Sequence, residues 1–353
     1  MQEQITLGDI MYQYGESYIR RNHIPLQETD IIRLLSMCRT ALPGSHYINC
    51  DHCNYQGKAY NSCRNRHCPK CQHQDQLQWM NARMNELLPV GYYHLVFTIP
   101  CELNPLCLSN KKVMYDILFK AASQTVLELC RDPKHLGAEI GLITVLHTWG
   151  QNMMEHPHLH YIIPAGGLSL DKQYRVPVLS LVDNLYEKGW NINIQTPFGN
   201  PVKVLVYLSR YVFRIARSDK RILDVNNGKV FFNWKDFRTG LFRKMSLDID
   251  KFIRRFLLHV LPQGFFKVRY YGLFSSRHRK ENIQLVKELI ARNKLFKKEE
   301  AFEDGLTVWE KQDTIWDEII QAILNYRKPN CPVCKKGMLH FAGLVPSHLN
   351  GSG

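Results

Sequence analysis

Hydrophobic and polar residues follow two different periods along the chain, and together they predict a protein of helices and antiparallel strands. Apolar positions spaced for one helix face predict helices within 1–37, 77–88, 105–131, 201–217 and 248–261. Runs rich in β-branched and aromatic residues predict strands at 92–100, 141–148, 158–164, 229–234 and 241–247. Because strands follow one another across short turns instead of alternating with helices, we expect an α+β fold and not a doubly wound sheet.

The same pattern divides the chain into three regions. We expect a helical, cysteine-rich module over 1–88, a strand-rich core over 89–279 and a charged helical C-terminal region over 280–353. Within the core, residues 168–200 show no regular period and are expected to be irregular. The helix predicted at 201–217 begins with proline, a residue favoured at the first helical position.

The composition is that of a folded globular protein without a membrane role. The 353 residues are 45% hydrophobic, which is enough to bury a sizeable core. No stretch approaches the roughly 18 apolar residues of a membrane span. The first ten residues, MQEQITLGDI, lack the basic and apolar segments of an export signal. We therefore expect a cytoplasmic protein.

Positive charge is concentrated in one part of the chain and indicates a polyanionic partner. Residues 201–280 contain 19 Lys and Arg against 5 Asp and Glu, an excess equal to the whole net charge of +14. Such a surface attracts nucleic acid through its phosphates. The candidate DNA-binding residues are Arg64, Arg66, Lys70, Arg210, Arg214 and Arg217. Arg64, Arg66 and Lys70 could instead brace the N-terminal module. Trp234, Tyr270 and Tyr271 could stack on unpaired bases or pack in the core.

Six of the eleven cysteines lie between residues 38 and 71, which indicates metal binding. In a reducing compartment such clusters bind metal more often than they form disulfides. Two CxxC pairs have the spacing of a four-thiolate zinc site, and we predict one zinc ion bound by Cys50, Cys53, Cys68 and Cys71. A second, Cys2His2 site is possible, although these residues could equally be packing residues: Cys38, His46, Cys63 and His67.

A further CxxC pair, Cys331 and Cys334, lies near the end of the chain. It has no second cysteine pair nearby in the sequence. His340 and His348 could complete a site with it, but we expect no ordered metal site there.

A stretch with four histidines between residues 147 and 160 is the most informative part of the chain. His158 and His160 alternate to the same face of a strand, so both imidazoles can reach one ion. If strands 141–148 and 158–164 pair antiparallel, His147 falls beside them. We favour His147 as the third ligand, with Gln151 and His156 as alternatives. Three protein ligands leave coordination positions open, as a catalytic metal requires.

Tyr207 and Tyr211 are four residues apart on the predicted basic helix, so both phenols share one face with Arg214. A phenol with a pKa near about 10 is a poor nucleophile, and nearby guanidinium charge favours its attack. Alone, such a pair is more typical of core or aromatic surface. Together with the histidines and the basic region, it indicates a nuclease.

These motifs, in this order, resemble the insertion-sequence-91 family of rolling-circle transposases, a two-tyrosine branch of the HUH endonuclease superfamily. The resemblance spans about residues 30–280 and rests on the runs SCRNRHCPKCQ, YHLVFTIP, HTWGQ, HPHLH, YLSRY and RYYGLFSSR. It implies a five-stranded antiparallel sheet that carries the histidines, with flanking helices. It also implies a tyrosine helix whose phenols face the metal, so that 89–279 is the nuclease core and 1–88 a zinc-binding DNA-recognition module.

The resemblance further implies the chemistry and the partners. A tyrosine would nick single-stranded DNA at the element end, keep a 5′-phosphotyrosine link and transfer the strand to target DNA. The histidines would hold Mg²⁺ or Mn²⁺, and the N-terminal module one or two Zn²⁺. A host helicase and the replication machinery are expected partners. The alternatives are a plasmid replication initiator or mobilisation relaxase with the same chemistry, and a non-catalytic zinc-dependent DNA-binding regulator that needs neither tyrosine.

Overall fold

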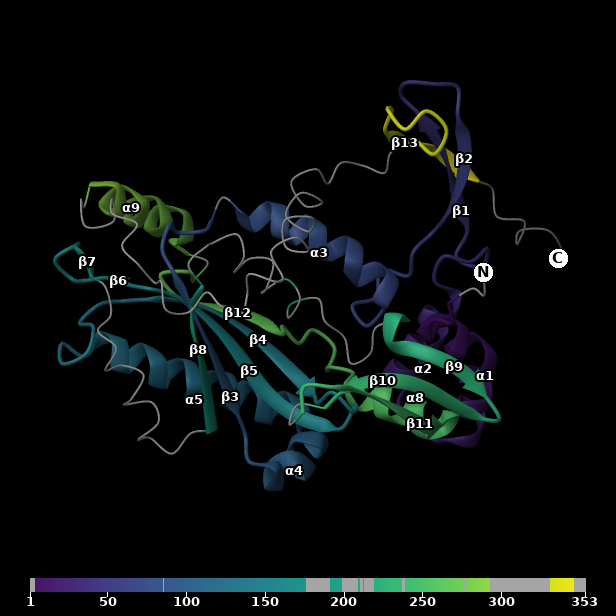
Figure 1. Cartoon of the computed structure of the whole chain (residues 1–353), viewed down its shortest axis with the longest axis horizontal. Helices are drawn as coiled ribbons and strands as arrows, with labels where there is room; N and C mark the ends of the chain where they lie inside the picture. The colour runs from purple at the N-terminus through teal and green to yellow at the C-terminus, as the bar shows by residue number, and fades with distance from the viewer. Residues whose placement is uncertain are drawn as a thin grey trace.

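The computed structural model contains one large antiparallel sheet, a helical body with a small sheet, and a separate three-stranded sheet (Figure 1). The description below covers residues 4–84, 86–175, 191–198, 209, 212, 219–236, 239–275, 277–292 and 331–345. The mixture of helices with antiparallel sheets confirms the predicted α+β class. None of the described helices is long and apolar enough to cross a membrane.

The large sheet has five strands in the order β12-β4-β5-β3-β8, and every neighbouring pair is antiparallel. The strands are β3 (Tyr92–Thr98), β4 (Gly141–Trp149), β5 (Glu155–Pro164), β8 (Asn191–Phe198) and β12 (Val268–Gly272). The predicted antiparallel pairing of the strands at 141–148 and 158–164 is confirmed. The expectation that 168–200 is irregular is wrong at its end, because β8 pairs with β3 and forms an edge of this sheet.

Helices cover both faces of the large sheet (Figure 1). On one face, α5 (Lys111–Arg131) packs against alternate apolar residues such as Leu146 and Tyr161. On the opposite face, α3 (Pro69–Met84) and α9 (Arg279–Arg292) lie over Val145 and Ile162. The alternation of side chains along each strand produces these two cores, because neighbouring residues point to opposite faces.

The helical body is built from two segments far apart in the sequence, residues 7–37 and 222–258, which share one core. Its elements are α1 (Leu7–Arg21), α2 (Leu26–Met37), β9 (Ile222–Asn226), β10 (Lys229–Lys235), β11 (Phe242–Asp248) and α8 (Ile249–Leu258). Thr6 begins α1 with a capping box, in which its hydroxyl accepts from the Asp9 amide and the Asp9 carboxylate accepts from the Thr6 amide. Phe252 and Phe232 are fully buried against the N-terminal helices. Core contacts therefore cross the predicted boundary at residue 88.

The third sheet joins two distant parts of the chain. β13 (Leu339–Val345) pairs antiparallel with β1 (Ser45–Cys50), and β1 pairs with β2 (Gln56–Tyr60). Figure 1 shows this C-terminal strand beside the N-terminal ones, apart from the large sheet. Short elements complete the description: η1 (Cys101–Leu103), α4 (Asn104–Ser109), β6 (Gly167–Leu168), β7 (Tyr174–Arg175) and η2 (Asp219–Arg221).

Two helix predictions differ in their bounds. The helix predicted at 77–88 begins eight residues earlier, directly after Cys68, and ends at Met84. The helix predicted at 105–131 is divided at Asn110, where α4 ends and α5 begins. Most of the helix predicted at 201–217 lies outside the described residues; Ser209 and Val212 are helical.

Candidate metal centres and active site

Three histidines meet on one face of the large sheet. The antiparallel register of β4 and β5 places His147 directly opposite His158, and His160 follows two residues later on the same face. One ligand nitrogen from each of the three lies within 4.8 Å of the others. His147 and His160 are buried, whereas His158 is partly exposed. The cluster therefore has a buried side and a side open to a ligand.

Hydrogen bonds fix the orientation of two of these rings. The Nδ1 of His158 lies 2.5 Å from the carbonyl oxygen of His156. The Nδ1 of His160 lies 2.9 Å from the Nε2 of His94, a buried histidine on β3. When Nδ1–H donates, Nε2 becomes the metal-binding nitrogen of the ring. Neutral imidazoles in this arrangement fit a divalent cation.

The two alternative third ligands do not join the cluster. The Oε1 of Gln151 accepts a hydrogen bond from the Arg221 guanidinium at 2.5 Å. His156 is exposed, and its ring lies beside His158 on the outer side of the group, with the ring centroids 5.0 Å apart. The structure thus brings together His147, His158 and His160, the combination that the sequence favours.

The predicted tyrosines, Tyr207 and Tyr211, lie outside the described residues, as do Arg210, Arg214 and Arg217. Ser209 and Val212, which belong to the same stretch, are buried. Val212 packs in one cluster with Val145 and Ile162. Val145 and Ile162 lie two positions from His147 and His160 on the same face of the sheet, so Val212 packs on the face that carries the histidines.

His94 was not identified from the sequence, and its contact yields a prediction. Replacing His94 by leucine removes the acceptor that orients His160, and we expect Mn²⁺ affinity of the purified protein to fall roughly 10- to 100-fold. His94→Gln should restore much of it, since its side-chain oxygen can accept the same hydrogen bond. Isothermal titration with Mn²⁺ measures both variants. Equal affinity of His94→Leu and wild type would contradict a positioning role.

Four cysteine thiols form a compact cluster between α2 and α3. Sulfur–sulfur distances are 3.5 Å for Cys38–Cys68 and 3.6 Å for both Cys38–Cys71 and Cys63–Cys71. A tetrahedral zinc with Zn–S bonds of about 2.3 Å has sulfur–sulfur edges of about 3.8 Å, so the four thiols fit this ion. Burial raises the pKa of the Cys38 thiol well above its ordinary value, and a bound zinc ion would replace that proton.

This grouping corrects the predicted zinc ligands. Cys68 and Cys71 join Cys38 and Cys63, while Cys50 and Cys53 lie elsewhere, beside Cys331 and Cys334. The predicted Cys2His2 combination does not form either. The Nδ1 of His46 lies 2.9 Å from the Asn61 side-chain oxygen. His67 also stays outside both thiol clusters, with its backbone amide donating to Asn65.

The basic residues of the N-terminal module have different surroundings. The Arg66 guanidinium donates to the carbonyl oxygens of Leu261, Pro262 and Phe265, which favours the bracing interpretation for this residue. Arg64 is exposed and Lys70 is partly exposed. Among the aromatic candidates, Tyr270 and Tyr271 pack against opposite faces of the large sheet.

Two family models match the chain, and each contains one of these centres. A model described as "Transposase zinc-binding domain" matches residues 10–99, which include the cluster of Cys38. A model described as "Putative transposase" matches residues 141–177 and 176–282, which include the three histidines. No solved structure matches the chain at a significant level. The sheet, the histidines and the thiol cluster thus belong to a zinc-binding transposase, a protein that acts on DNA.

Two curated relatives indicate the transposase family to which the chain belongs. The chain is 37% identical over 334 residues to "Putative transposase y4qJ" of Sinorhizobium fredii, covering 80% of this chain and 84% of that protein. It is 25% identical over 294 residues to the transposase for insertion sequence element IS801 of Pseudomonas savastanoi pv. phaseolicola, covering 71% of each. The chain belongs to the insertion-sequence-91 family of transposases. The resemblance seen in the sequence is confirmed.

Proposed function

We propose that this transposase is an HUH-type endonuclease that nicks and rejoins single-stranded DNA through a tyrosine. One observation carries the proposal: Val212 packs on the sheet face that carries three histidines with metal-binding geometry. In the sequence, Tyr207 lies two residues before Ser209, and Tyr211 directly precedes Val212. A tyrosine nucleophile next to Val212 in the sequence would therefore lie on the same side of the large sheet as the cation site.

The reaction follows from the chemistry of these residues. His147, His158 and His160 would hold Mg²⁺ or Mn²⁺, which, when bound, polarises the scissile phosphate and offsets its charge. The phenol oxygen of Tyr207 or Tyr211 attacks phosphorus and gives up its proton to water, while the bond to the 3′-oxygen breaks and that oxygen takes up a proton from water. The 5′-phosphate stays on the tyrosine as a phosphodiester. A 3′-hydroxyl can later attack this link, release the tyrosine and join the strands.

The surface of the helical body supports binding to unpaired DNA. On β11, Phe242, Arg243 and Lys244 are all exposed, and Phe242 and Lys244 share one face of the strand. The Arg221 guanidinium lies 5.9 Å from the centroid of the Phe242 ring. Positive groups that contact phosphates, combined with an exposed ring that stacks on a base, are typical of single-strand binding. We propose that this surface holds the strand that enters the histidine site, with a host helicase and the replication machinery supplying and copying it.

The proposal predicts a covalent protein–DNA adduct. Incubated with Mn²⁺ and a labelled single strand carrying the element end, wild type should form an adduct that resists denaturing electrophoresis. Tyr207→Phe/Tyr211→Phe should form none, because neither position then carries a nucleophile. Each single variant should retain part of the nicking if the phenols share a face.

The control for this experiment is Tyr12→Phe, which removes an exposed phenol on α1, away from the large sheet. It should leave adduct formation unchanged. Absence of an adduct from wild type, or an undiminished adduct from the double variant, would refute tyrosine catalysis. A plasmid origin strand that is nicked in preference to the element end would favour the initiator or relaxase alternative.

A further inference from the structure

The second thiol cluster brings together cysteines from the two ends of the chain. Cys50 and Cys53 lie at the end of β1 and in the turn that follows it, whereas Cys331 and Cys334 lie in the turn that leads to β13. The Cys50 and Cys334 sulfurs are 3.7 Å apart, and the Cys53 and Cys331 sulfurs are 3.6 Å apart. All four sulfur atoms lie within 4.8 Å of one another.

These distances fit a metal ion and not disulfides. A disulfide holds two sulfurs about 2.05 Å apart. The observed separations instead approach the edge of about 3.8 Å in a tetrahedral zinc–thiolate site. All four cysteines are free thiols in the structure.

Backbone amides around the cluster are directed at its sulfurs. The amide of His52 donates to the Cys50 sulfur at 3.3 Å, and that of Gly337 donates to the Cys334 sulfur at 3.3 Å. Such hydrogen bonds favour the thiolate, the form of cysteine that binds metal. Each CxxC turn, one from each end of the chain, thus has a backbone amide directed at one of its sulfurs.

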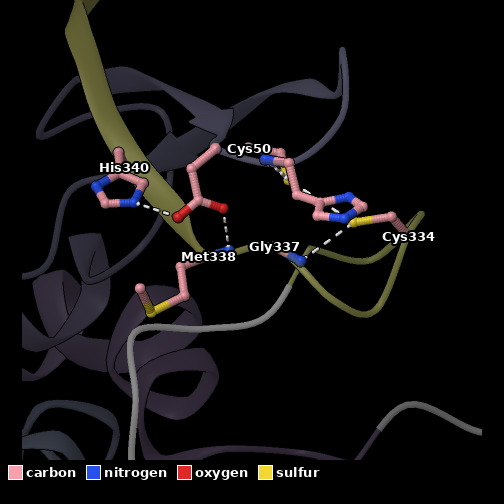
Figure 2. Close-up of polar contacts among 7 residues, drawn as sticks. Cys50, Cys334, Gly337, Met338 and His340 are labelled. Atoms are coloured by element: carbon pink, nitrogen blue, oxygen red, sulfur yellow. Dashed lines mark hydrogen bonds and ion pairs between the residues drawn. The ribbon is translucent and has the colours of Figure 1, made fainter.

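The two turns are also joined by contacts of their own (Figure 2). The Asp51 carboxylate accepts from the Met338 amide at 2.7 Å and lies 3.0 Å from the His340 Nε2, and the Asp51 amide donates to the Met338 carbonyl. Gly337 approaches so closely that an added Cβ would lie 2.3 Å from the Cys50 sulfur. Glycine is therefore required where the second turn meets the first.

We propose that Cys50, Cys53, Cys331 and Cys334 bind one zinc ion that fastens the C-terminal segment to the N-terminal module. This site is separate from the cluster of Cys38, Cys63, Cys68 and Cys71, which is part of the helical body's core. The family's zinc-binding model ends at residue 99 and so contains only half of the ligands. The other half comes from more than 270 residues further along the chain, in the region where the sequence predicts no ordered site.

Paired substitutions in the full-length protein test the shared site. We expect Cys50→Ser/Cys53→Ser and Cys331→Ser/Cys334→Ser each to lose one zinc equivalent relative to wild type, measured by elemental analysis. The quadruple variant should lose the same single equivalent. Co²⁺ substitution, read through the thiolate-to-cobalt charge-transfer absorption, counts sulfur-bound metal alone and excludes ions held by histidine. Cys101→Ser, which removes an exposed thiol outside both clusters, is the control.

Hydrogen exchange distinguishes local loss of the site from general unfolding. In Cys50→Ser/Cys53→Ser, the amides of β13 should lose protection although no residue of β13 has changed, while those of α1 should keep theirs. Gly337→Ala should weaken zinc binding while leaving all four thiols in place, whereas Lys336→Ala should not. Two results would overturn the proposal: wild-type zinc content in Cys331→Ser/Cys334→Ser, or loss of all zinc from either double variant.

Discussion

His160→Ala is expected to reduce Mn²⁺-dependent nicking of the element end by about a thousandfold or more. A metal ion at a scissile phosphate contributes several kcal/mol to transition-state stabilisation, and about 1.4 kcal/mol corresponds to each factor of ten in rate. His160 is buried at the centre of the cluster, so neither water nor a neighbouring side chain readily replaces its nitrogen. Single-turnover cleavage of a labelled strand, with Mn²⁺ in excess, measures the effect.

The matched control is His156→Ala. His156 lies on the same strand but is exposed and outside the cluster. Its backbone carbonyl, which contacts the His158 Nδ1, is kept in the variant, and only the outer ring contact with His158 is lost. This variant should cleave at close to the wild-type rate. Both variants should bind the same strand without metal as well as wild type does, because neither substitution changes the surface that we propose holds the strand. Nicking by His160→Ala at the wild-type rate would show that the histidine cluster takes no part in the reaction.

Cys68→Ser is expected to unfold the helical body. Structural zinc contributes on the order of 10 kcal/mol to the folding of small modules, which is comparable to the whole stability of a typical domain. Cys68 is 2% exposed and belongs to the same apolar core as Phe252 of α8. Loss of the ion should therefore disorder both the N-terminal helices and the strands β9–β11. Hydrogen exchange over α1 and α8, with and without a zinc chelator, is the measurement.

Cys130→Ala provides a buried control, since Cys130 is fully buried on α5 but has no part in either thiol cluster. This variant should lose no more stability than a small cavity costs, and the protein should retain its full zinc content. If Cys68→Ser kept wild-type protection in α1 and α8, zinc would have no structural role in this core. Retained zinc with lost protection would point to packing alone.

The central strands and the histidine cluster could be predicted because their signals are local. β3 and β4 are near-continuous apolar runs and β5 ends in one, and the antiparallel pairing of β4 with β5 follows from their short connection. His147 could be placed beside His158 by the same argument. β8 was missed because Asn191, Asn193 and Gln195 make its sequence half polar, and its partner strand lies almost 100 residues earlier. An edge strand of this kind carries a weak pattern of its own.

The pairing of the cysteines could not be predicted from spacing. Three CxxC pairs and five single cysteines allow several tetrahedral combinations, and pairs that are close in the sequence look like partners. The actual partners depend on β13, a strand near the end of the chain that pairs with β1 near its start. This pairing brings Cys331 and Cys334 beside Cys50 and Cys53. His94 could have been noticed as a polar residue in the otherwise apolar run YYHLVFTIP. Its contact with His160, however, follows only from the register of β3 and β5.

The core shared by α1, α2 and α8 has a consequence for synthesis on the ribosome. Chains emerge N-terminus first, and domains commonly fold as they appear. Here the first helices leave the exit tunnel long before Phe232 and Phe252, the residues that complete their core. The apolar faces of the first helices must therefore stay exposed while some 200 further residues are translated. We expect nascent chains truncated before β10 to depend on chaperones, and those extending past α8 to be released from them.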